Sequence, residues 1–174
     1  MTNQTKNTRT KNVTSIVSLT GVSRHTLDRI GVNLAKAGDI TKSVGRGLHA
    51  KEITPGDVAK ILIAMMAANV TSKSSEVVKR YSELRCGKNK FGDALESILS
   101  NYNLAQEVVA ISAVRNYPEA IISWNDGSEG VFRADDSERP GMRVEVTLSG
   151  NEVISRLAWD LKQAKEYHSG KPGK

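Results

Sequence analysis

The stretch from Val58 to Met66 constrains the fold of this 174-residue chain more than any other. Its side chains are apolar nearly all round a helix, so such a helix must be buried on most sides. The residues before it give a clear start: Thr54 is a favoured N-cap, Pro55 suits the first turn, and Asp57 suits the positive helix end. We therefore predict a helix to about Ala68, either as the central helix of the core or as a subunit interface.

The apolar pattern on both sides of this helix predicts an α+β fold. Thr71-Ser72 should cap a helix to about Arg85 that ends at Cys86-Gly87, and Phe91 to Leu99 should form another. Strands are expected at 108–114, 120–124, 130–132 and 142–148. Ser149 and Glu152 have capping-box spacing before a closing helix. Its expected inner face is Val153, Ile154, Leu157, Ala158 and Leu161.

The net charge of the chain is concentrated at its N-terminal end. Residues 1–53 hold nine Lys and Arg against three Asp and Glu, which accounts for the whole formal charge of +6. Residues 54–174 hold sixteen of each and are neutral. A basic segment beside a neutral remainder indicates a polyanionic partner for that segment. The alternative is a solvated basic tail, and residues 1–11 have the composition of a flexible arm.

A turn and a second helix are predicted within this basic segment. Gly21 suits a tight turn because glycine adopts positive φ without steric cost. Ser23 is a favoured N-cap, and Leu27, Ile30 and Leu34 form one apolar face after it. Gly38 is a C-cap signal, so the helix should end near Ala37. The polar residues then point mostly outward.

The pattern Gly-Val-Ser-x-x-Thr-Leu-x-Arg from Gly21 to Arg29 resembles the helix-turn-helix of bacterial and phage repressors. The first helix of the motif would span residues 14–20. One position departs from the usual pattern, since Val17 stands where such motifs carry a small residue. The resemblance covers roughly residues 12–53 and implies that the helix after Ser23 reads the major groove of DNA.

Residues 39–53 resemble the wing of a winged helix. Two short β-prone pieces, near Ile40-Thr41 and near Glu52-Ile53, flank a Gly-Arg-Gly tip. The two glycines permit a tight turn, and Arg46 would extend toward phosphate or the minor groove. The alternative is a plain flexible linker that carries a surface arginine.

We predict that the chain binds double-stranded DNA in a sequence-specific manner and acts as a transcriptional regulator of bacterial or phage origin. An arginine at the start of the second helix is able to pair with guanine through two hydrogen bonds. Side chains assigned to DNA contact there are Ser23, Arg24, His25, Thr26 and Arg29, and those assigned to phosphates are Lys36, Lys42 and Arg46.

The sequence offers no catalytic pattern, so we expect no enzyme, cofactor or metal. One cysteine, Cys86, and three dispersed histidines lack zinc-ligand spacing, and neither a phosphate-loop nor a Gly-x-Ser-x-Gly pattern occurs. The acidic loop with Asp135, Asp136 and Glu138 has ligands for a divalent ion, but such loops are usually solvated. The lone thiol fits a reducing cytosol. No signal peptide or membrane span is expected, so we predict a cytoplasmic protein.

Two other functions remain open from the sequence. The order of a helix-turn-helix, a helical middle and a β-rich end resembles phage small terminase subunits, which assemble as rings and recognise viral DNA. The other open function is that of a phage protein that inhibits a host nucleic-acid enzyme without binding DNA. A homo-oligomer is expected, as a dimer or a ring. The predicted parts are an arm (1–11), a DNA-binding unit (12–53), a helical middle for oligomerisation (54–104), an α+β region (105–165) and a tail (166–174).

Overall fold

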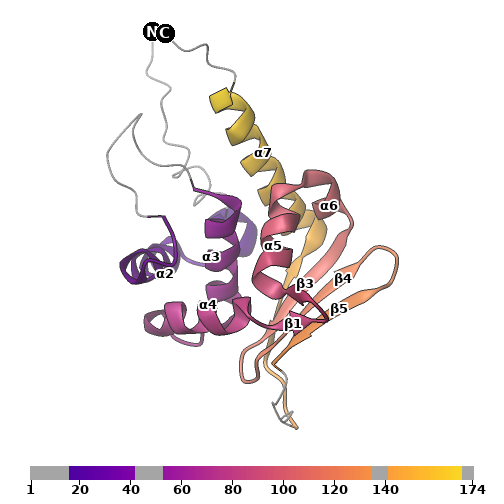
Figure 1. Ribbon diagram of the computed structural model, residues 1–174. Helices are drawn as coiled ribbons and strands as arrows, with labels where there is room; N and C mark the ends of the chain where they lie inside the picture. The colour runs from indigo at the N-terminus through magenta and orange to yellow at the C-terminus, as the bar shows by residue number, and fades with distance from the viewer. Residues whose placement is uncertain (1–15, 42–52, 135–140, 170–174) are drawn as a thin grey trace.

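In the computed structural model, residues 16–41, 53–134 and 141–169 are described, and they form an α+β fold (Figure 1). Residues 16–20 are helical, and the helices that follow are α2 (Arg24–Ala37), α3 (Pro55–Ala67), α4 (Ser74–Ser82), α5 (Phe91–Ser100), α6 (Tyr102–Gln106) and α7 (Ser155–Ser169). Two short segments, the 3-10 turn η2 (Thr71–Lys73) and the π-helical η3 (Gly150–Ile154), precede α4 and α7. The strands are β1 (Arg85–Cys86), β2 (Asn89–Lys90), β3 (Val108–Val114), β4 (Glu119–Trp124), β5 (Glu129–Arg133) and β6 (Glu145–Ser149).

The six strands form one sheet in the order β2-β1-β5-β4-β3-β6, and each neighbouring pair is antiparallel. Ile111 of β3 lies opposite Ile122 of β4 and Leu148 of β6, and all three side chains are buried. Directly opposed residues share one face of a sheet, so these three side chains lie on the same face. That face packs against the helices, since all three belong to the hydrophobic cluster that includes α3 and α5 residues. The expected strands at 108–114, 120–124 and 130–132 are confirmed.

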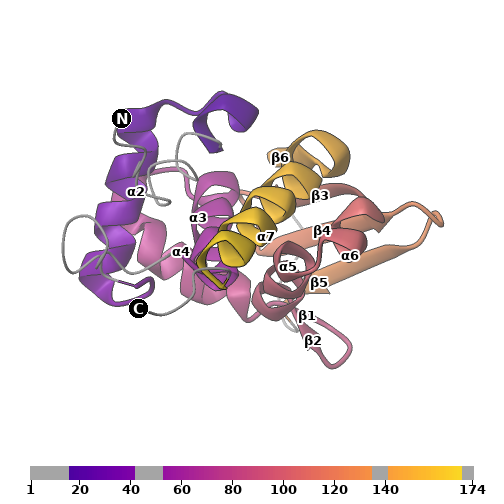
Figure 2. The ribbon, with the colours of Figure 1, turned by 90° about the horizontal axis from the view of Figure 1, so that it is seen from above.

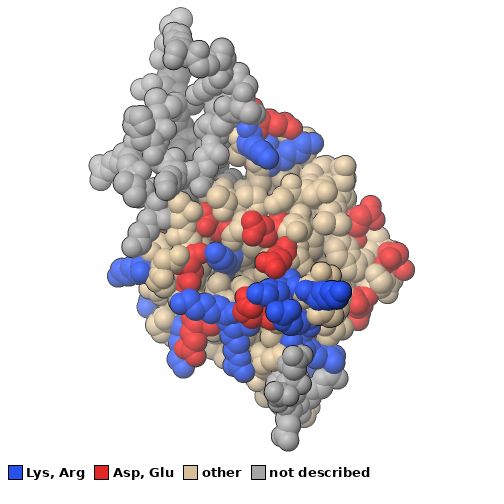
Figure 3. Space-filling view, viewed as in Figure 1, with Lys and Arg blue, Asp and Glu red and all other residues tan. Residues whose placement is uncertain are grey.

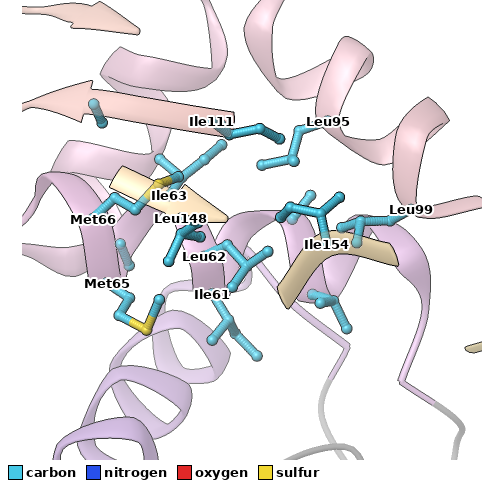
Figure 4. Packing of buried hydrophobic residues seen from close by; sticks show 14 of the residues in the cluster. Ile61, Leu62, Ile63, Met65, Met66, Leu95, Leu99, Ile111, Leu148 and Ile154 are labelled. Atoms are coloured by element: carbon cyan, nitrogen blue, oxygen red, sulfur yellow. The ribbon is translucent and has the colours of Figure 1, made fainter. Parts of the chain in front are cut away.

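The apolar helix α3 is the central helix of the core, the first of the two alternatives that its sequence allowed. Eleven of its thirteen residues are buried. Leu62, Ile63 and Met66 converge with Ile111 and Leu148 of the sheet (Figure 4). In the view of Figure 2, α2 lies on the side of α3 away from the sheet. A single hydrophobic cluster includes buried residues from 16 to 161, and the division of the chain into five parts stays a prediction.

Specific hydrogen bonds hold both ends of α3. The predicted start is confirmed, with Thr54 as N-cap in a reciprocal capping box with Asp57 and Pro55 in the first turn. At the other end, the Arg115 guanidinium donates to the carbonyl oxygens of Met66 at 2.8 Å and Met65 at 3.3 Å. A cation at this end is favourable because the last carbonyls carry partial negative charge.

The predicted helix from Thr71-Ser72 to Arg85 is wrong at both ends. The 3-10 turn η2 takes residues 71–73, and α4 then runs only to Ser82. Arg85-Cys86 and Asn89-Lys90 instead pair as a β-hairpin whose two-residue loop starts at Gly87, with φ of 58°. Glycine at this first central position fits a tight hairpin turn, and β1 also pairs with β5, which removes Arg85 from the helix.

The C-terminal part also differs from its prediction in two places. The expected strand 142–148 begins at Glu145, because Asn116 holds the residues before it. The Asn116 side chain accepts from the Val144 N–H at 2.9 Å and donates to the Met142 oxygen at 2.8 Å. The closing helix reaches Ser169, so residues 166–169 are helical and do not belong to a tail. Its predicted inner face is buried, and its cap is confirmed by the Ser149 hydroxyl, which accepts from the Glu152 N–H.

Tyr81 fastens α4 to the sheet through a buried hydroxyl. Its single O–H is shared between the carbonyl oxygens of Val114 and Tyr117, with the Tyr117 oxygen at 3.1 Å. Burial raises the pKa of Tyr81 above its usual value, and the nearby charge of Arg80 opposes that rise. Since the folded-state pKa lies above the unfolded one, this tyrosine stabilises the fold below pH of about 10 and loses that contribution as the pH rises further.

We expect the Tyr81→Phe variant to lose about 1–2 kcal/mol of unfolding free energy at neutral pH, because the buried hydrogen bonds of the hydroxyl to Val114 and Tyr117 are lost, although the Tyr117 oxygen keeps the Glu119 N–H. At alkaline pH the difference between wild type and variant should narrow, since only the wild type loses stability by ionising Tyr81. Urea denaturation of both proteins at pH of about 7 and about 11 measures this. A difference that stays constant with pH would contradict the assignment.

Candidate nucleic-acid interface

Helix α2 begins and ends where its sequence predicted. The Ser23 hydroxyl accepts from the Thr26 N–H at 3.2 Å, which satisfies a donor of the first turn. Gly38 closes the helix in the left-handed conformation, with φ of 79°, and its N–H donates to the Ala35 oxygen. Before the helix, Gly21 has φ of 68° and makes the turn after the helical residues 16–20.

The two faces of α2 differ sharply in burial. Leu27, Ile30 and Leu34 are buried and form the inner face. The outer face is a stripe of four exposed side chains with spacings of four, three and four residues. We call it the α2 stripe, and it consists of His25, Arg29, Val32 and Lys36. A polar, basic outer face over a packed inner face is suited to the major groove of DNA.

Sequence reasoning missed Val32, the apolar member of the α2 stripe. Its side chain is 51% exposed in the middle of the stripe. Val32 lies three residues after Arg29 and four before Lys36, and residues with these spacings lie on one helix face. This spacing could have predicted that Val32 belongs to the outer face. An exposed apolar side chain beside cations can contact the methyl group of a thymine.

The other predicted site residues lie beside the stripe or outside the described part. Arg24 is exposed on one flank, where its Nε lies 3.9 Å from the Asp28 carboxylate, one turn on. Ser23 and Thr26 lie at the N-terminal end and bond to each other through their hydroxyls at 2.9 Å. Thr26 is half-buried, and its backbone N–H is the donor that the Ser23 cap accepts. Lys42 and Arg46 fall in residues 42–52, outside the described residues.

The strands expected at the base of the wing do not form in the described residues. Ile40 is buried in the hydrophobic core and Thr41 follows it without strand pairing; Ile53 likewise lies outside any strand. One carboxylate instead holds the backbone at the two ends of this segment, at Thr41 and Thr54. The Asp57 carboxylate accepts from the Thr41 N–H at 3.0 Å and from the Thr54 N–H at 3.1 Å. The candidate wing itself lies outside the described residues.

Three polar contacts fix α2 and the residue after its C-cap, Asp39, on the rest of the chain. Asn33 donates to the Thr71 oxygen of η2 at 2.8 Å. Lys60 of α3 donates to the Asp39 carbonyl at 2.7 Å, and Lys79 of α4 lies 3.8 Å from the Asp39 carboxylate. The α2 stripe therefore projects from a fixed helix rather than from an isolated arm.

The described residues do not form a candidate metal site. Within them, no three His, Cys, Asp or Glu side chains come together as a metal site would require. The acidic loop at Asp135, Asp136 and Glu138 and the arm at 1–11 lie outside the described residues. None of the described helices combines the length and the apolar character needed to cross a membrane.

Fold and site together define an α+β protein with a packed, outward-facing basic helix at its N-terminal side. Comparison of the chain with protein-family models, with curated proteins and with solved structures gives no match. The functional argument therefore depends on the geometry and chemistry of the site.

Proposed function

We propose that this protein binds double-stranded DNA in a sequence-specific manner and acts as a transcriptional regulator. The observation that carries the proposal is the α2 stripe of His25, Arg29, Val32 and Lys36 over a buried inner face. In this proposal, residues 16–37 are a helix-turn-helix whose second helix enters the major groove.

The charge and the start of α2 support this proposal. The helix carries Arg24, Arg29 and Lys36 against one acidic residue, Asp28, and its first turn contains no acidic side chain. Its N-terminal end therefore combines the positive end of the helix dipole with exposed cations, which favours approach to phosphates. Arg29, in the first half of the helix and with its side chain exposed, is the residue best placed to read a guanine.

The proposal predicts a specific pattern of binding losses. Replacing Arg29 by alanine should weaken binding to the preferred site by about 1–3 kcal/mol and relax specificity at one base pair. Replacing Arg24 should have a similar effect, whereas Lys36→Ala should weaken all sequences alike, because phosphate contacts carry no sequence information. A random-sequence duplex selection at two salt concentrations, followed by titration of each variant, measures both effects.

A matched control is Arg156→Ala, which removes an exposed arginine of α7 that also pairs with an acidic residue one turn on, Asp160. This control should bind DNA like the parent. If the parent enriches no site and binds no duplex at low salt, the proposal fails. If the Arg24 and Arg29 variants bind as well as the parent does, α2 is not the reading helix.

The alternative of a ring-forming packaging subunit depended in part on the apolar helix 57–68 as an oligomer interface. That helix is α3, and its burial within the core of its own chain leaves it little surface for a partner subunit. We therefore propose the regulator. Enrichment of a palindromic site would fit a dimer, as the two-fold symmetry of an operator mirrors that of its protein.

A further inference from the structure

Three cationic side chains stand in register across neighbouring strands at one end of the sheet. Lys90 of β2 lies opposite Arg85 of β1, and Arg85 lies opposite Arg133 of β5. Directly opposed residues project from the same face of an antiparallel sheet, and like charges in this position are destabilising. We call this row the cationic ladder. The fold tolerates a local electrostatic cost here.

The two outer members of the ladder are neutralised, but the central one is not. Lys90 lies 2.7 Å from the Glu83 carboxylate, and Arg133 lies 2.5 Å from the buried carboxylate of Glu119. Arg85 is exposed and has no ion pair with any of the described residues. Lys88, exposed in the hairpin loop next to Gly87, is likewise unpaired within the described part. The hairpin therefore presents two uncompensated cations.

The hairpin belongs to a stretch of the chain that is rich in basic residues. Residues 71–90 hold six Lys and Arg against two Glu, within a C-terminal remainder that is neutral as a whole. Helix α4 leads into the hairpin, since it ends at Ser82 and β1 begins at Arg85, and its Lys79 lies beside Asp39, which follows α2. Figure 3 shows Lys and Arg side chains gathered with some acidic ones over the part where Figure 1 draws α4 and β1.

We propose that the β1–β2 hairpin binds the phosphate backbone of duplex DNA, with Arg85 and Lys88 as the contacting side chains. This inference rests on the proposed function. An anionic backbone would supply the countercharge that Arg85 lacks in the chain itself. Contacts of this kind position a protein on a duplex without reading its bases. They also release condensed counterions, which makes affinity fall with salt.

The test is the salt dependence of duplex binding by the full chain. We expect the Arg85→Gln and Lys88→Gln variants each to reduce the slope of log K against log salt by about 0.9. If variant and parent bind equally at 1 M salt, this change in slope makes the affinity of each variant about eightfold lower than that of the parent at 0.1 M salt. The loss should be the same for every DNA sequence. The preferred site found by selection should not change. Arg156→Gln on α7 is the charge-matched control and should keep the parental slope.

Thermal unfolding separates this role from a structural one. Because Arg85 stands between two cations, its neutralisation should leave Tm unchanged or slightly higher. A lower Tm for the Arg85→Gln variant, or a parental salt slope in both hairpin variants, would overturn the inference while leaving the proposed function intact. Failure of the parent protein to bind any duplex would overturn the proposed function, and this inference with it.

Discussion

Replacing Gly150 by alanine is expected to lower the free energy of unfolding by about 3 kcal/mol or more. Gly150 is buried where β6 passes into η3, and the chain there lies directly against the start of β3. An added Cβ would stand 1.7 Å from the Val108 carbonyl oxygen and 2.9 Å from the Val109 carbonyl carbon. These are backbone atoms, so the clash has no rotamer to relieve it, and the sheet or η3 must move.

Gly31 provides a control of opposite sign for this substitution. It lies inside α2, where an added Cβ meets no atom within 4 Å. Since alanine is the better helix former by about 1 kcal/mol, Gly31→Ala should stabilise the protein slightly. Urea denaturation of both variants measures the difference. A Gly150→Ala variant that unfolds at the parental urea concentration would show that the β6–η3 junction does not require glycine.

The elements that sequence predicted correctly are those whose signals lie within a few residues. Ser23 and Gly38 bound α2, and Thr54 with Asp57 starts α3, because caps act through bonds over two to four positions. The apolar character of α3 likewise required burial wherever the helix went. These local signals were sufficient to place the candidate reading helix and its inner face.

The elements that sequence missed depend on partners far along the chain. The β1–β2 hairpin is tied to the sheet by the pairing of Arg85 with Arg133, and no local pattern shows that two segments so far apart become neighbours. The same holds for Asn116, which holds Met142 and Val144 outside the ladder. The cationic ladder was therefore invisible in a count that found residues 54–174 neutral as a whole.

The second large effect is expected at Asp57, where replacement by alanine should lower the free energy of unfolding by about 2–4 kcal/mol. Asp57 is 5% exposed, and its carboxylate accepts hydrogen bonds from the N–H groups of both Thr41 and Thr54. Its loss leaves two backbone donors without their acceptor and breaks the capping box of α3. The same substitution also removes the hydrogen bond that links Thr41, just after α2, to the start of α3.

Asp93 is the matched control, because it occupies the same third position of its helix, α5, and also follows a glycine. It is exposed, so Asp93→Ala should cost only the dipole interaction of about 0.3–1 kcal/mol. Denaturation of the two variants in parallel isolates the Thr41 and Thr54 bonds from the shared helix-end effect. Equal losses at the two positions would mean that Asp57 acts only as a first-turn carboxylate and that the link between α2 and α3 lies elsewhere.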